Sequence, residues 1–84
     1  MTIEEQIRAY ISKEILYSNN GFPCSDEESL LDKGIIDSTG IMQLVLFVEE
    51  NFNLSVQDHE ITPMNFDSIT KLSEYIRSKM EARN

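Results

Sequence analysis

The middle of the chain holds a run of apolar residues at helical spacing, and this run opens directly after an aspartate and a serine. Asp37 is a favourable N-cap residue because its carboxylate can accept a hydrogen bond from the backbone N–H of Thr39 or Gly40. The spacing predicts a helix over about 38–51, ended by the sequence Asn51-Phe52-Asn53. We expect three of its side chains to face a core and two to flank them: Leu44, Phe47 and Val48, with Ile41 and Val45.

The two ends of the chain show the same periodicity. Thr2 and Glu5 have the spacing of a capping box, and the apolar pattern after them stops near 17–21, where Asn and Gly favour termination. Its apolar positions are Ile3, Ile7, Tyr10, Ile11 and Ile15. A last helix is predicted after Asp67 or Ser68, both good caps. Its apolar stripe is Ile69, Leu72, Ile76 and Met80 with Tyr75 beside it, and the basic residues near its end are Arg77, Lys79 and Arg83.

The segments between these helices have little periodicity. The connection over 22–36 carries apolar residues that we expect to pin it over the helices: Leu30, Leu31, Ile35 and Ile36. A short helical turn is predicted near 58–61, and Pro63 either ends that turn or opens another after Thr62. Because both segments hold few apolar anchors for their length, we expect both to open readily.

These elements predict an all-α fold: a small bundle of three main helices plus one short helix, with a long loop between the first two. Its 84 residues suffice for a single domain over 1–84. No uncharged apolar run approaches the roughly 20 residues of a membrane-spanning helix. The acidic N-terminus lacks the basic and apolar regions of a signal peptide, so we expect a cytoplasmic protein.

The charge balance limits the class of partner. Seven basic residues against fifteen acidic ones give a net charge of -8, which argues against binding nucleic acid. No Lys or Arg lies between Lys33 and Lys71. This acidic interval either steers basic partners or is simply a solvated face, and charge alone leaves both open. Cys24 and His59, the single cysteine and histidine, form no metal-ligand spacing, so neither a metal site nor an internal disulfide is predicted.

Ser38 is placed in the first turn of the central helix, but the sequence gives it no catalytic base. A nucleophilic serine needs a base within hydrogen-bond reach, and His59 is predicted on a short polar turn. We therefore predict no enzymatic activity. An exposed, unactivated serine is typical of an attachment point, and Gly40 would let an enzyme or an attached group approach the backbone. The alternative is an ordinary Asp-Ser helix start without a function.

The wider context resembles the acyl carrier protein family. The resemblance covers nearly the whole chain and is strongest over 30–76, where the following stretches carry it: Gly34-Ile35-Ile36-Asp37-Ser38, Leu44-Val45-Leu46-Phe47-Val48-Glu49-Glu50-Asn51-Phe52, Val56-x-Asp58-x-Glu60-Ile61-Thr62-Pro63, Asn65-Phe66-Asp67-Ser68-Ile69 and Tyr75-Ile76. It implies that Ser38, with Asp37 as cap and motif residue, carries 4′-phosphopantetheine, attached covalently from coenzyme A by a phosphopantetheinyl transferase. The thiol of that arm would hold an acyl, aminoacyl or polyketide intermediate as a thioester.

The resemblance also implies partners. These would be an acyl- or amino-acid-activating ligase, synthases and transferases with basic docking surfaces, contacting a monomeric carrier at Thr39, Met42, Leu46, Glu49 and Glu50. Many fatty-acid carriers have Leu where Thr39 stands and an acidic residue where Gln43 stands, so this chain looks more like specialised stand-alone carriers. The alternative is an unmodified interaction or adaptor subunit of the same fold, which would not need Ser38.

Overall fold

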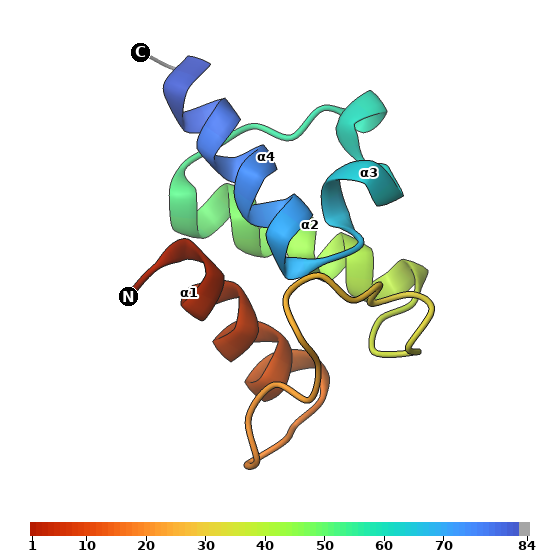
Figure 1. Cartoon of the computed structure of the whole chain (residues 1–84). Coiled ribbons are helices and arrows are strands. Elements are labelled where there is room, and N and C mark those ends of the chain that lie inside the picture. Colours follow the sequence, from red (N-terminus) through yellow and green to blue (C-terminus); the bar gives the residue numbers. More distant parts are fainter. Residues whose placement is uncertain (83–84) are drawn as a thin grey trace.

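The computed structural model describes residues 1–82, and all regular elements in that part of the chain are helical. Figure 1 shows three longer helices, α1, α2 and α4, with the short α3 beside the start of α4. The elements are α1 (Ile3–Tyr10), the π-helical turn η1 (Ile11–Ile15), α2 (Ser38–Phe52), the 3-10 turn η2 (Asp58–Glu60), α3 (Pro63–Phe66) and α4 (Ile69–Ala82). The predicted all-α bundle is confirmed. Arg83, one of the basic residues expected near the end of the last helix, lies outside the described residues.

The helix starts follow the predicted capping chemistry. Thr2 and Glu5 form the expected capping box, with reciprocal bonds of 3.1 Å and 2.9 Å between side chain and backbone N–H. Helix α1 then widens into the π-helical turn η1, which the sequence did not predict. The segment ends at Tyr17, whose left-handed φ of 52° stops the helical path before the Asn and Gly residues are reached.

The second half of the chain settles two choices that the sequence left open. Pro63 opens a helix of its own, α3, with Thr62 as the N-cap. Ser68 is the cap of α4, because its Oγ accepts a hydrogen bond from the Lys71 N–H at 3.0 Å. Asp67 has a different role, described below. Near its C-terminal end, α4 pairs Arg77 with Glu4 of α1 at 2.8 Å.

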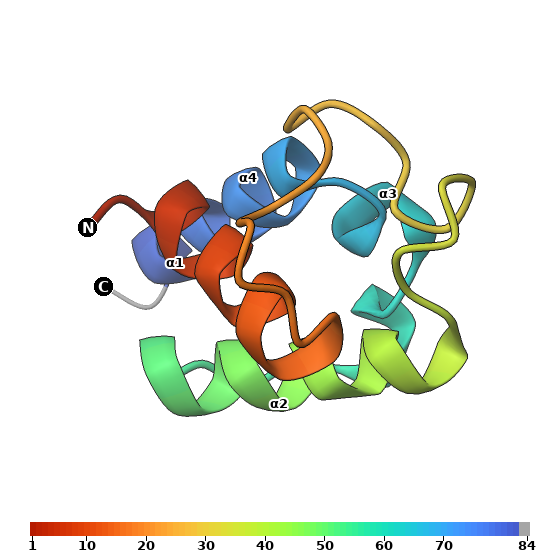
Figure 2. The same ribbon diagram turned by 90° about the horizontal axis from the view of Figure 1, so that it is seen from below.

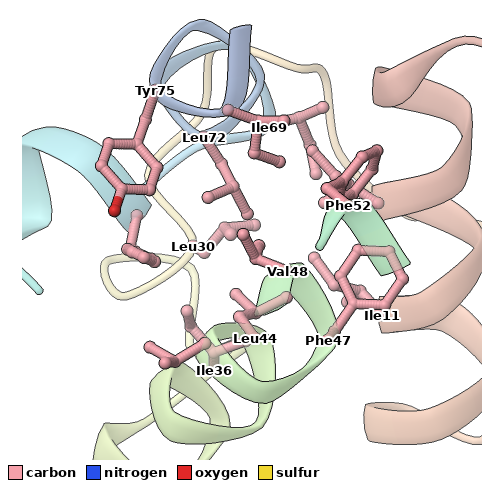
Figure 3. Packing of buried hydrophobic residues seen from close by; sticks show 14 of the residues in the cluster. Ile11, Leu30, Ile36, Leu44, Phe47, Val48, Phe52, Ile69, Leu72 and Tyr75 are labelled. Atoms are coloured by element: carbon pink, nitrogen blue, oxygen red, sulfur yellow. The ribbon is translucent and has the colours of Figure 1, made fainter. Parts of the chain in front are cut away.

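The core forms where α1, α2 and α4 meet the long connection. Figure 3 shows Leu30 and Ile36 from that connection among the side chains of α2 and α4, including Leu44 and Leu72. Leu30, Leu44 and Leu72 are fully buried, and Ile36 is nearly so. The expectation for Leu31 is wrong, because 36% of this residue is exposed. Ile35 packs against the core while remaining partly accessible.

The long connection is held by two aspartates as well as by its apolar residues. Asp26 pairs with Arg8 of α1 at 2.6 Å, and its carbonyl oxygen accepts a bond from the Thr70 N–H at 3.0 Å. Asp67 accepts bonds from the Ser29 hydroxyl at 2.5 Å and from the Leu31 N–H at 2.9 Å. In addition, the Leu30 N–H donates to the Asp67 carbonyl oxygen at 2.8 Å. We call the contacts of Asp67 with residues 29–31 the Asp67 latch.

The turn η2 is tied down in a similar way. Glu60 accepts hydrogen bonds from the Tyr75 hydroxyl at 3.1 Å and from the Lys79 Nζ at 3.0 Å, both on α4. The Asn65 side chain donates to the Glu60 carbonyl oxygen at 2.8 Å. The expectation for both connections counted only apolar contacts, and these polar contacts are anchors that it left out. That the two segments open readily stays a prediction. Within residues 1–82, no helix is long and apolar enough to cross a membrane.

Candidate functional site

Ser38 lies at the first position of α2, on the protein surface. The preceding Asp37 is extended, and its Oδ1 accepts a hydrogen bond from the Gly40 N–H at 2.9 Å, so the predicted N-cap is confirmed. The Asp37 carbonyl oxygen accepts the Ile41 N–H, also at 2.9 Å. This geometry fixes the backbone on both sides of Ser38 while its side chain stays accessible.

The first turn of α2 leaves backbone donors available. In the described chain, the N–H groups of Ser38 and Thr39 have no hydrogen-bond acceptor, as is usual at the start of a helix. They lie at the positive end of the dipole of a 15-residue helix. Such an end favours a negatively charged group attached at Ser38.

Gly40 has a different role from the one predicted. It is buried, and a Cβ at this position would lie 3.0 Å from Ile36 Cβ and 3.3 Å from Ile36 Cγ2. The glycine therefore allows Ile36 of the long connection to pack directly against α2. This contact covers Gly40 on the side where a Cβ would lie, although Gly40 also lines the open hollow described below.

No neighbouring side chain activates Ser38 in the described structure. The His59 side chain is exposed on η2 and forms no hydrogen bond with Ser38. Cys24 is half-buried in the long connection, and burial together with Glu28 raises the pKa of its thiol. No group of three His, Cys, Asp or Glu side chains in residues 1–82 could hold a metal ion.

Two side-chain stripes follow α2 from the turn that carries Ser38. Positions four apart lie on the same face of a helix, so Ser38, Met42 and Leu46 form one stripe. Met42 and Leu46 are 50% and 56% exposed, as predicted. Thr39 and Gln43 form the neighbouring stripe, which turns toward the end of η1.

The second stripe forms one wall of an open hollow with a volume of about 510 Å³. The hollow lies between η1, the last residues of the long connection and the first turns of α2. Figure 2 shows these three segments around the start of α2. The lining residues include Ile15, Ile35, Ile36, Asp37, Thr39 and Gln43. From the sequence, Gln43 was notable only because it replaces the acidic residue of many fatty-acid carriers. No local pattern shows that η1 packs opposite it.

Several acidic residues of the interval over 33–71 are engaged inside the protein. Glu49 accepts a bond from the Val56 N–H at 3.0 Å. Glu60 and Asp67 are held by the contacts described above. Glu50 and Asp58 are exposed and have no ion pair in residues 1–82, so the acidic surface is smaller than the composition suggests.

Comparison with known proteins finds similarity to carrier proteins. Over 56 residues, the chain is 29% identical to D-alanyl carrier proteins of Streptococcus pyogenes serotypes M5, M49 and M1. The match spans 67% of this chain and 71% of each relative. No family model matches the chain. The similarity to carrier proteins supports a carrier role for this chain.

Proposed function

We propose that this chain is a carrier protein whose Ser38 hydroxyl is the attachment point for 4′-phosphopantetheine. The observation that carries the proposal is an exposed serine on a rigidly capped helix start, without a base beside it. A serine that performs catalysis needs such a base, whereas a serine modified by another enzyme needs only access. The similarity to D-alanyl carrier proteins supports the same role.

The residues around Ser38 fit this prosthetic group. A phosphodiester at Ser38 would lie beside the unpaired N–H groups of Ser38 and Thr39, where the helix dipole favours negative charge. Asp37 fixes the first turn and thereby orients the hydroxyl. Since no side chain of the described residues is hydrogen-bonded to the Ser38 hydroxyl, we expect the transferase to supply the base that takes its proton. Once attached, the arm supplies a thiol that holds the cargo as a thioester, and this chain presents it.

For the cargo, we propose an amino acid. The relatives are D-alanyl carrier proteins, which favours an aminoacyl thioester over a fatty-acyl or polyketide one. Thr39 and Gln43, which depart from the residues of many fatty-acid carriers, agree with a specialised carrier. The holo-protein should then be charged by an amino-acid-activating ligase. If a fatty-acid synthase used this chain as efficiently as it uses its own carrier protein, the aminoacyl proposal would be refuted.

The partners are proposed on the same basis. Met42 and Leu46 are exposed apolar side chains in line with Ser38, as expected for residues that an enzyme contacts while it works on the serine. Glu50 and Asp37 would add negative charge for enzymes with basic docking surfaces. Thr39 is a secondary candidate. Glu49 is another, since its carboxylate already accepts a hydrogen bond from the Val56 N–H. With such partners, we propose a cytoplasmic monomer that meets its enzymes one at a time.

The proposal is tested by intact mass after incubation with coenzyme A and a broad-specificity phosphopantetheinyl transferase. We expect a gain of one phosphopantetheine on the wild type and none on Ser38→Ala. Ser25→Ala is the matched control, because it removes an exposed serine hydroxyl away from the proposed docking residues and should still be loaded. If the wild type gains no mass with a transferase that loads another carrier, the unmodified adaptor becomes the better explanation.

A further inference from the structure

The hollow beside Ser38 has no role in the function proposed so far. The residues Asp37 and Thr39, which flank Ser38, both line it. Its volume of about 510 Å³ falls within the range of small-molecule sites, which is roughly 300–1,000 Å³. An open hollow of this size next to an attachment point can receive part of whatever is attached there.

The lining of the hollow combines apolar and polar groups. Ile15, Ile35 and Ile36 supply apolar surface from the side of η1 and the long connection. Across from them, α2 supplies the Thr39 hydroxyl and the Gln43 amide, and neither side chain forms a hydrogen bond within residues 1–82. Gln43 is half-buried, with its backbone carbonyl oxygen accepting the Tyr10 hydroxyl at 3.3 Å. Its side-chain amide remains accessible and is free to hydrogen-bond with a ligand in the hollow.

Charge selects which part of an attached group can enter. Asp37 is the one ionisable residue among those that line the hollow, so a phosphate is repelled from it. The phosphate is favoured instead at the free N–H groups of the first turn. Only the uncharged portion beyond the phosphate fits the hollow, and in pantetheine this portion alternates a dimethyl-substituted carbon, a hydroxyl and amides.

We infer that the hollow is a docking site for the pantetheine arm attached to Ser38. This inference rests on the proposed function. The branched methyl groups lie against Ile15 and Ile35, and the Gln43 amide hydrogen-bonds with the hydroxyl or first amide of the arm. The docked arm lies on the Thr39–Gln43 stripe, so the exposed Met42–Leu46 stripe stays free for an enzyme partner. Gln43 is thus a positioning residue for the arm.

The test uses NMR of the holo-protein, after intact mass has confirmed one phosphopantetheine on Ser38. We expect nuclear Overhauser effects between the geminal methyls of the arm and the methyls of Ile15 and Ile35. The Gln43 side-chain amide resonances should shift between the apo and holo forms. Gln43→Leu keeps the size of the side chain and removes its hydrogen bonds, so it should lose these Overhauser effects while still being loaded. Asp58→Ala, on the exposed turn η2 and not among the lining residues, should retain them.

The outcomes separate the two proposals. Loading at Ser38 without contacts between the arm and Ile15 or Ile35 overturns the docking site and leaves the carrier function intact. Contacts from the arm to Met42 or Leu46 overturn it equally. Failure to load Ser38 overturns the proposed function, and the docking site with it.

Discussion

Replacing Asp67 by alanine should destabilise the protein by about 2 kcal/mol, because it removes the side-chain part of the Asp67 latch. The carboxylate accepts two hydrogen bonds, from the Ser29 hydroxyl at 2.5 Å and from the Leu31 N–H at 2.9 Å. A hydrogen bond to a charged group contributes about 1.5–3 kcal/mol when well shielded. Asp67 and its partners are only partly buried, so the two bonds together should give a value near the contribution of one such bond.

The assay is urea unfolding at pH 7, followed by far-UV circular dichroism, with Asp58→Ala as the matched control. Asp58 is exposed, and its replacement changes the net charge by the same amount without removing a side-chain hydrogen bond of the described structure. A loss of about 2 kcal/mol corresponds to a fall in melting temperature on the order of 10 °C for a domain of this size. The control should stay within about 0.5 kcal/mol of the wild type.

A double-mutant cycle with Ser29→Ala isolates the bond between the two side chains. We expect a coupling energy of about 1 kcal/mol between Asp67 and Ser29. Hydrogen exchange should also show faster exchange at the Leu31 amide in Asp67→Ala. The reasoning is refuted if Asp67→Ala is no less stable than Asp58→Ala, or if the two mutations in the cycle add without coupling.

Two further predictions concern the start of α2 and the contact between the terminal helices. Gly40→Ala should destabilise the protein by about 1 kcal/mol, because overpacking against Ile36 costs about 1–3 kcal/mol and exceeds the gain in helix propensity. The control is Thr39→Ala, at an exposed position. A Gly40→Ala protein that is more stable than the wild type in urea would contradict the packing argument. A hydrogen bond from Arg77 lowers the pKa of Glu4 from 4.5 to about 2. Its stabilising effect is therefore present above about pH 4.5 and lost as the pH falls through about 2. Glu4→Gln should reduce the acid-induced loss of stability in this window by up to about 1 kcal/mol, since the pair is partly exposed. The measurement is the free energy of unfolding at pH 2, 3, 4 and 6. A variant whose free energy of unfolding changes with pH as steeply as that of the wild type would count against this prediction.

The main helices could be predicted because the signals that define them are local. The cap at Asp37 and the left-handed Asn53 that ends α2 act on neighbouring backbone groups. The apolar spacing of α2 likewise identified the side chains that face the core. The same holds for Ser38, whose position in the first turn follows from the cap alone. Helix caps and apolar spacing act within one or two helical turns, so both can be read from the sequence.

The following features escaped prediction because they depend on how the long connection packs, and this connection has little periodicity. Asp67 looked like a helix cap because capping is a common local role of aspartate. In the structure, residues 29–31 donate hydrogen bonds to its carboxylate and its carbonyl oxygen. Gly40 looked like an open approach to the backbone because its glycine character is local, whereas Ile36 covers it on the side where a Cβ would lie. Leu31 is apolar yet exposed, because the turn that buries Leu30 directs its neighbour outward.

This division also explains why the proposed attachment point and the proposed docking site differ in predictability. Ser38 needs only its own helix start, so a short motif identifies it. The hollow needs Ile15 from η1, Ile35 from the long connection and Gln43 from α2, which come together only when the core is formed. The Asp67 latch acts on residues 29–31, a few positions before the wall that Ile35 provides. Loosening the latch should therefore disturb the hollow before it disturbs Ser38, so that an Asp67→Ala protein is still loaded but holds its arm less firmly.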